Sequence, residues 1–144
     1  MVKSFISPNN KGTIIKNNVE ITPLIPSYIV KENQILISIS DTNLSFIVET
    51  HLGEIFNVLS ELNISVNLMQ NSAVSFSICI DHNKKRVSKL IEILKKSFNV
   101  YFNEDLTLFT IRHYDQKAVD LVLKDKELIL EQKSRNTIQM VLKQ

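Results

Sequence analysis

The hydrophobic positions of the chain follow two different periods. Between residues 52 and 62 they recur at the spacing of one helical face. These positions are Leu52, Ile55, Phe56, Leu59 and Leu62. From residue 74 to residue 80 they alternate with Ser75, Ser77 and Cys79, which is the period of a strand with one apolar face. The two patterns predict an amphipathic helix and a strand of the sheet on which it packs.

Further elements around this pair complete a βαββαβ order. A strand at 35–39 ends in the turn residues Asp41-Thr42-Asn43, and 64–69 forms the strand after the helix. A second helix is predicted by hydrophobic residues at the same spacing, namely Val87, Leu90, Ile91, Leu94 and Phe98. With a strand at 100–102, this is the ferredoxin-like arrangement, an α+β fold.

The remainder of the chain repeats most of this order. Strands are predicted at 106–111, 128–132 and 137–142, and a helix at 116–124 with Ala118, Leu121 and Val122 facing inward. A Gln-x-Ser loop occurs in both copies, at Gln70 and Ser72 and again at Gln132 and Ser134, which indicates an internal duplication. The second copy lacks a strand, so we expect a segment before Ile35, such as 13–15 or 28–30, to complete its sheet. The first ferredoxin-like unit would then be inserted within the second.

Composition and charge narrow the classes of partner. The chain has 144 residues, 44% of them hydrophobic and 22% charged, which suits one domain or two small ones. A net charge of +2 without a concentrated basic patch argues against a nucleic acid or a membrane as partner. The single cysteine, Cys79, lies in an apolar strand pattern, and the N-terminus lacks the apolar core of a signal peptide. We therefore expect a soluble cytoplasmic protein.

The sequence lacks the residue patterns of common active sites. Two glycines, Gly12 and Gly53, exclude glycine-rich phosphate-binding loops. The three histidines are scattered, and one cysteine cannot build a zinc site. The exposed faces of the central strands carry serines where an RNA-binding sheet would carry aromatic residues. We expect no catalytic residue, no metal site and no cofactor in this chain.

A small binding site is the chemistry that remains. The first helix begins near residues 50–53, where unpaired backbone N–H groups and the positive end of the helix dipole suit a carboxylate. The Asn67 carbonyl, the side chains of Gln70 and Asn71, and Ser72 offer acceptors for an ammonium group. Together they fit an amino acid. The alternative interpretation is that these residues only cap the helix and turn the chain.

Two stretches resemble aspartokinases. VKSFISPNNKGTIIKN (2–17) resembles the end of the kinase domain of that family, and HLGEIFNVLSELNISVNLMQNSAVSFSICID (51–81) is similar to its first ACT domain. The resemblance implies that 1–18 is the tail of the kinase domain, 35–104 the first ACT domain, and 19–34 with 105–144 the second. The family phosphorylates aspartate with ATP. The ATP and Mg²⁺ sites belong to the kinase domain, whose Lys-Phe-Gly-Gly-Thr-type motif does not occur in this chain.

The resemblance also implies which positions contact an effector. They are Ser45, Val48, Thr50, His51, Leu52, Gly53, Val66, Asn67, Leu68, Asn71 and Ser72, with Ala73 beside them. In lysine-sensitive relatives two of these positions are acidic, where this chain has Asn67 and Ala73. We expect feedback inhibition by an end-product amino acid, lysine before threonine, bound where two chains form a homodimer through their ACT domains. The alternative is a dimerisation module that binds no ligand. The loop at Gln132 and Ser134 is expected to serve packing.

Overall fold

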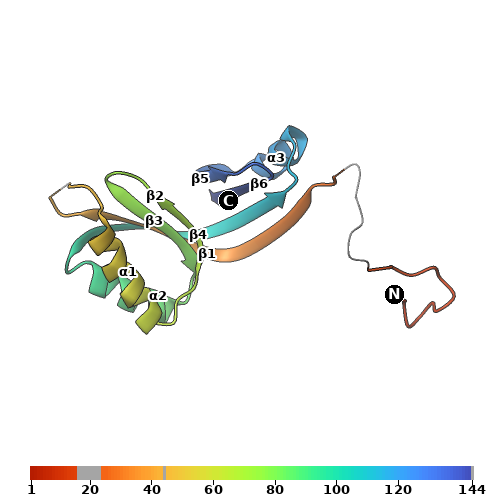
Figure 1. The fold of residues 1–144 in the computed structure, drawn as a ribbon, viewed down its shortest axis with the longest axis horizontal. Helices are drawn as coiled ribbons and strands as arrows, with labels where there is room; N and C mark the ends of the chain where they lie inside the picture. The colour runs from red at the N-terminus through yellow and green to blue at the C-terminus, as the bar shows by residue number, and fades with distance from the viewer. Residues whose placement is uncertain (16–23, 44, 144) are drawn as a thin grey trace.

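The computed structural model describes residues 1–15, 24–43 and 45–143, and it contains one six-stranded antiparallel sheet with three helices (Figure 1). The elements are β1 (Ser27–Asp41), α1 (Glu49–Glu61), β2 (Val66–Asn71), β3 (Ser75–Asp81), α2 (Lys84–Leu94), β4 (Phe98–Arg112), α3 (Gln116–Leu123), β5 (Glu127–Lys133) and β6 (Thr137–Lys143). The strands lie in the order β2-β3-β1-β4-β6-β5. In the described part of the chain, the helices are all too short or too polar to cross a membrane.

The strands β1 and β4 each run through both halves of the molecule (Figure 1). The sequence predicts separate strands at 100–102 and 106–111, but they are two parts of β4. Polar residues at 103–105 indicate a turn in the sequence, whereas the strand only bends there, at Asp105 with a φ of 57°. In β1 the corresponding bend is at Asn33, which has a φ of 53°.

The predicted duplication is visible in the strand register. Met69 lies opposite Ile78 in the first half, and Glu131 lies opposite Met140 at the corresponding place in the second half. Both hairpins have a bulge at the same point, between Val66 and Leu68 in β2 and between Leu128 and Leu130 in β5. A bulge adds one residue to a strand and bends it. The two copies therefore share irregular features as well as their order of elements.

The strand expected to complete the second copy is the first part of β1. Residues 27–31 pair antiparallel with residues 108–112 of β4, and β6 pairs with the other side of the same segment. The predicted boundary between 1–18 and 19–34 falls within residues 16–23, which lie outside the described part of the chain.

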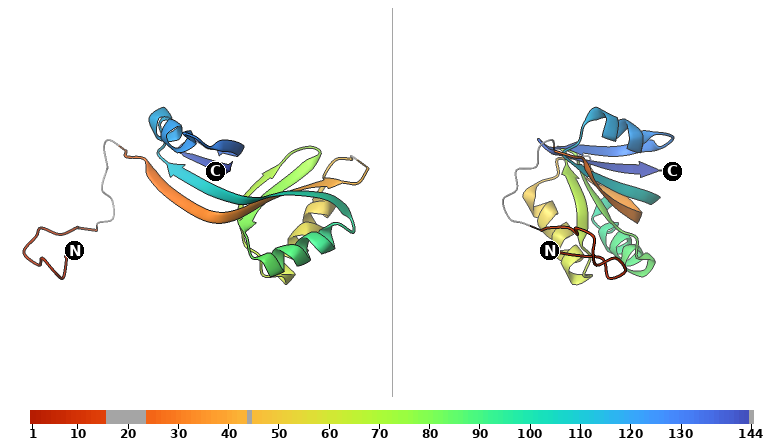
Figure 2. Two further views of the ribbon diagram at one scale, coloured as in Figure 1. Left: turned by 180° about the vertical axis from the view of Figure 1, so that it is seen from behind. Right: turned by 90° about the vertical axis from the view of Figure 1, so that its right-hand side faces the viewer.

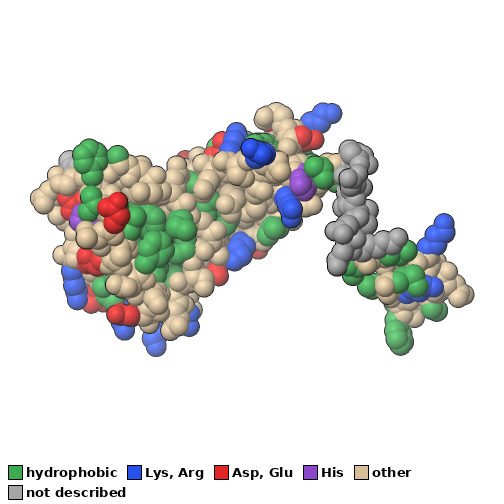
Figure 3. Space-filling view, in the orientation of Figure 1, with side chains coloured by type: hydrophobic (Ala, Val, Ile, Leu, Met, Phe, Trp, Pro, Cys, Tyr) green, Lys and Arg blue, Asp and Glu red, His purple; other side chains and the backbone are tan. Residues whose placement is uncertain are grey.

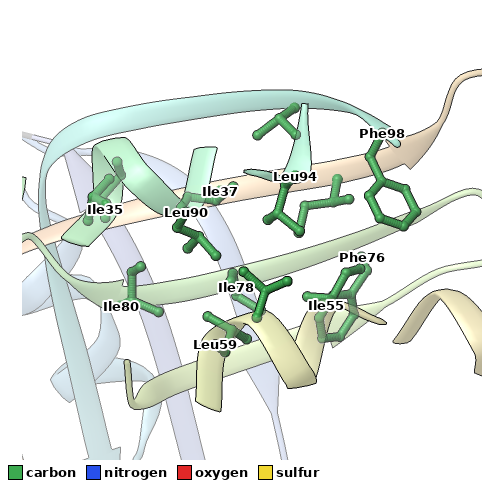
Figure 4. Packing of buried hydrophobic residues seen from close by; sticks show 14 of the residues in the cluster. Ile35, Ile37, Ile55, Leu59, Phe76, Ile78, Ile80, Leu90, Leu94 and Phe98 are labelled. Carbon is green, nitrogen blue, oxygen red and sulfur yellow. The ribbon is translucent and has the colours of Figure 1, made fainter. Parts of the chain in front are cut away.

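The main core lies between the sheet and the helices α1 and α2. Figure 4 shows Ile55 and Leu59 of α1 and Leu90 and Leu94 of α2 directed at the sheet, and all four are buried. Burying one such side chain stabilises the fold by about 1.5–3 kcal/mol. Facing them from the sheet are Ile35, Ile37, Ile39, Phe76, Ile78 and Ile80. The helical spacing thus identified the core-facing side of both helices.

Two side chains predicted to face inward are exposed. Phe56 is 40% exposed and contacts Phe76 at 5.7 Å between ring centroids, and Leu121 is 68% exposed. The short helix α3 buries Ala118, Val119 and Val122 instead, because its contact with the sheet is centred on that side. Phe98, predicted as the last position of the second helix, is the buried first residue of β4.

A third cluster joins the two halves on the face of the sheet that carries no helix. It comprises Leu36, Leu68, Cys79, Leu106, Leu108 and Val141. Leu36, Leu68 and Cys79 come from the first half, and the other three from the second. Figure 2 shows α3 on the opposite outer side of the molecule from α1 and α2, so the helix-free faces turn toward each other at the junction.

Candidate functional site

Helix α1 begins beside the loop between β2 and β3. Ile47, just before the helix, donates its backbone N–H to the carbonyl of Ala73 at 2.9 Å. The helix begins at Glu49, and Leu52 donates its N–H to the Val48 carbonyl at 3.2 Å. Helix residues before Leu52 have N–H groups with no acceptor inside the helix, as at any helix start. The structure thus places the predicted positions at the start of α1 close to Ala73.

His51 and Gly53 differ in what surrounds them. The Nδ1 atom of His51 accepts the Val48 N–H at 3.4 Å, and its ring packs edge-on against Phe98 at 5.7 Å between centroids. His51 therefore helps to fix the helix start. At Gly53, an added Cβ would meet no described atom within 4 Å. A side chain at that position is accommodated by the fold.

Asp41 orders the segment that leads into α1. Its Oδ2 atom accepts backbone N–H groups from Asn43 and Ser45 at 3.2 and 3.3 Å. Partial desolvation raises the pKa of Asp41, but the hydrogen bonds from Ser45 and Asn43 outweigh this, and the nearby His51 adds to them, so the pKa lies below its ordinary value. Ser45 is thus held at the end of β1 by its backbone.

The hydroxyl of Ser72 is used within its own turn. It accepts the Ser75 N–H at 3.1 Å and lies 2.8 Å from the Ser75 hydroxyl. The backbone N–H of Ser72 also donates to the Ser75 carbonyl at 2.8 Å. The second copy repeats this last bond between Ser134 and Thr137, again at 2.8 Å. These contacts give Ser72 the turn-forming role that was the alternative interpretation of the loop.

The structure separates Asn67 and Leu68 from the start of α1. The bulge in β2 places the Asn67 side chain on the helix-free face, where its Nδ2 donates to Gln34 Oε1 and Asp81 Oδ1, both at 2.8 Å. Leu68 is buried in the cluster on that same face, whereas Val66 packs against the main core. Asn71 and the neighbouring Gln70 are exposed on β2, which is an edge of the sheet.

Three residues around Asn67 were not among the predicted site residues. Gln34 is 1% exposed and donates to Asp81 at 2.8 Å, and Lys31 donates to Asn67 Oδ1 at 2.7 Å. Hydrogen bonds from Gln34 and then Asn67 hold the pKa of Asp81 below its ordinary value. The sequence gives only a weak signal for this cluster, because Gln34 appears simply as the last polar residue before the apolar strand that begins at Ile35.

Exposed hydrophobic side chains gather near α1 and β2. We call this set the α1 patch, and Figure 3 shows hydrophobic side chains together at this end of the molecule. Its members are Phe46, Val48, Phe56, Met69 and Val74, each at least 40% exposed. They lie beside the free edge of the sheet at β2. An apolar patch next to an unpaired strand is a common site of protein association.

Comparison with known proteins agrees with this architecture. No protein-family model matches the chain. The fold is similar to a C-terminal regulatory domain of aspartate kinase from Porphyromonas gingivalis, with a TM-score of 0.67 and 19% identity over 83% of this chain and 86% of that one. It is also similar to Escherichia coli aspartokinase III solved with lysine and aspartate, with a TM-score of 0.68 and 22% identity over 87% of this chain and 31% of that one. The chain therefore has the same fold as these two structures.

The sequence is similar to two aspartokinases. The chain is 32% identical over 92 residues to the chloroplastic aspartokinase 1 of Arabidopsis thaliana, and 32% identical over 80 residues to the lysine-sensitive aspartokinase 3 of Escherichia coli. The matches cover 63% and 56% of this chain but 16% and 18% of those relatives. Sequence and fold are thus both similar to aspartokinases, and the α+β prediction is confirmed. The predicted effector residues stay a prediction.

Proposed function

We propose that this chain is the regulatory part of an aspartate kinase, in which it binds an end-product amino acid and inhibits phosphorylation of L-aspartate. The observation that carries the proposal is the hydrogen bond between Ile47 and Ala73, which joins the start of α1 to the β2–β3 loop. It brings helix N–H groups that suit a carboxylate next to a polar loop. The kinase domain would bind ATP and Mg²⁺, and this chain would supply none of those contacts.

Lysine is the first effector to test, and threonine the second. The Escherichia coli relative is lysine-sensitive, and aspartokinase III from that organism was solved with lysine. The start of α1 would hold the carboxylate that all amino acids share. Glu49 in the first turn opposes an anion there, so the backbone N–H groups must outweigh its charge.

The proposed assembly is a homodimer formed through the first ACT domain. The α1 patch and the free edge of β2 support it, because both lie on that domain and pairing would cover them. Effector bound at such a joint would favour one arrangement of the two chains, with a coupling of about 1–3 kcal/mol. The observation in favour of a ligand-free dimerisation module is Ser72, whose hydroxyl is already used by Ser75.

We further propose the division into a kinase tail at 1–18, a first ACT domain at 35–104, and a second made of 19–34 and 105–144. The pairing of 27–31 with 108–112 supports this division, since it gives the second half a four-stranded sheet. The matching bulges in β2 and β5 support it as well.

Titration calorimetry with lysine and then threonine, with solution mass recorded in parallel, tests the function. We expect a dimer with saturable binding of one amino acid. Gly53→Glu should abolish binding, because it adds a carboxylate one turn after Glu49 near the start of α1, where the fold has room for it. Ser88→Glu, at an exposed position of α2, is the matched control and should bind normally. A folded dimer that gives no heat with either amino acid would instead establish the ligand-free module.

A further inference from the structure

The side chain of Asn67 has its hydrogen-bonding groups engaged by the chain itself. A carboxamide offers two N–H donors and one carbonyl oxygen. The two donors go to Gln34 Oε1 and Asp81 Oδ1, and the oxygen accepts the Lys31 ammonium at 2.7 Å. The same ammonium lies 4.0 Å from Asp81 Oδ1. We call Asn67 Oδ1 and Asp81 Oδ1 the acceptor corner, and Lys31 fills it.

The fold does not require a polar corner at this place. By strand register, the second half has Leu106 where the first has Gln34, and Lys143 where the first has Asp81. The bulge residue that corresponds to Asn67 is Ile129, and Val141 corresponds to Cys79. The second copy thus forms the same bulged hairpin with apolar side chains at three of these four places and a lysine, which offers no acceptor, at the fourth. The acceptors in the first copy serve a purpose other than forming the bulge.

The acceptor corner is accessible from outside. A cavity of about 210 Å³ lies beside Asn67, lined also by Val66, Met69, Gln132 and Gln139. Lys31 and Asp81 have 47% and 67% of their side chains exposed, so the attraction between them is screened by water. A cation from solution is therefore able to compete for the corner.

We propose that Lys31 is an internal competitor that determines effector specificity: its ammonium occupies acceptors that would otherwise bind a cationic amino-acid side chain. This inference rests on the proposed function, since the ligand in question is the effector: bound at the joint of the homodimer, it would place its carboxylate at the start of α1 in one chain and its side chain at the acceptor corner of the other. A group tethered to the same chain acts at an effective concentration in the millimolar range. To bind the acceptor corner, lysine in solution must displace the Lys31 ammonium. An amino acid with a neutral side chain makes no ionic contact there and need not displace it. A side-chain ammonium on the ligand should therefore not increase its affinity for the wild-type chain.

Calorimetric titration with lysine and norleucine tests this, because norleucine has an unbranched side chain without the ammonium. For wild type we expect affinities for the two ligands within about twofold of each other. Lys31→Met should bind lysine about tenfold more tightly than norleucine, the gain expected of one charge-assisted hydrogen bond. Lys133→Met is the matched control, since it removes a lysine that is 50% exposed and paired with Glu131 in the second copy. That variant should behave as wild type.

Each outcome separates this inference from the proposed function. Wild type that already prefers lysine over norleucine, or a Lys31→Met variant without that preference, overturns the role of Lys31 while amino-acid binding stands. Lysine binding by Lys31→Met alone supports the internal competitor and overturns feedback sensing by the native chain. If neither protein binds any amino acid, both proposals are overturned. Lys31→Gln provides a second variant should Lys31→Met fold poorly.

Discussion

Asn33 and Asp105 occupy equivalent bends of β1 and β4, and both have left-handed backbone conformation, with φ of 53° and 57°. A second equivalent pair, Asn63 and Asp125, precedes β2 and β5 with φ of 50° and 60°. Asn and Asp are the non-glycine residues that adopt this conformation most readily. The duplication thus preserved backbone angles at sites where the side chains have since diverged.

The bend at Asp105 predicts an unusual response to substitution. Asp105→Val should lower the free energy of unfolding by about 1–2 kcal/mol, because a β-branched residue is strained at positive φ. Asp105→Gly should stay within about 0.5 kcal/mol of wild type, since strain relief offsets the added chain entropy. Chemical denaturation measures both. Asn103→Val, an exposed position of the same strand, is the control, and an equal loss at both positions would contradict this account.

The α1 patch predicts which surface mutation separates the proposed dimer. Phe56→Ser should raise the dimer dissociation constant at least about tenfold, because aromatic side chains dominate protein interfaces. Sedimentation equilibrium gives that constant. Leu121→Ser removes an even more exposed hydrophobic side chain from α3 and should leave it unchanged. If Phe56→Ser leaves the dissociation constant unchanged and Leu121→Ser raises it, the interface lies on the second half.

Cys79 should be chemically inert in the folded chain. Burial, and secondarily the charge of Asp81, raises the pKa of its thiol from 9.0 to about 12. At pH 8 the thiol is neutral and inaccessible, so alkylation should be at least on the order of a hundredfold slower than in denaturant. Because the folded pKa is raised, this group's contribution to stability is present below pH 9 and is lost as the pH rises toward 12. Equally fast labelling of folded and unfolded chain would refute the buried position.

Asp81 should contribute to acid sensitivity. Its pKa is lowered by hydrogen bonds from Gln34 and Asn67 and, to a smaller extent, by Lys31, while burial raises it. A lowered folded pKa stabilises the fold above the ordinary value of 3.8, and this stabilisation is lost as the pH falls through the folded pKa. Denaturation midpoints between pH 3 and pH 7 should therefore change less in Asp81→Asn than in wild type. The effect is expected to be small because the carboxylate is largely exposed.

Periodicity predicted the elements well because most of them bury one side. The residues that α1 presents to the core, such as Ile55 and Leu59, were identified from spacing alone. Phe56 satisfies the same spacing and is nevertheless 40% exposed, because α1 buries a narrower stripe against the sheet than the pattern spans. The continuity of β1 and β4 was not predicted, because polar residues such as Asn33 and Asp105 indicate a turn in the sequence. Only the backbone angle shows that the strand bends there and continues.

The candidate site was harder to predict because it depends on contacts between distant segments. The approach of Ala73 to Ile47 is a single backbone hydrogen bond with no signature in residue type. The orientation of Asn67 is set by a bulge, which turns one residue out of the regular alternation. The resemblance to aspartokinases implies that Asn67 contacts an effector, and the bulge directs its side chain toward Lys31 and Gln34.

The long strands β1 and β4 make the two halves inseparable as folding units. Neither strand begins and ends within one half, so excising 35–104 would expose the cut ends of a sheet on both sides. The unfolding of either half withdraws pairing partners from the other. The chain should therefore melt in a single cooperative transition, and a protease that cuts β1 near Asn33 should release no stable half.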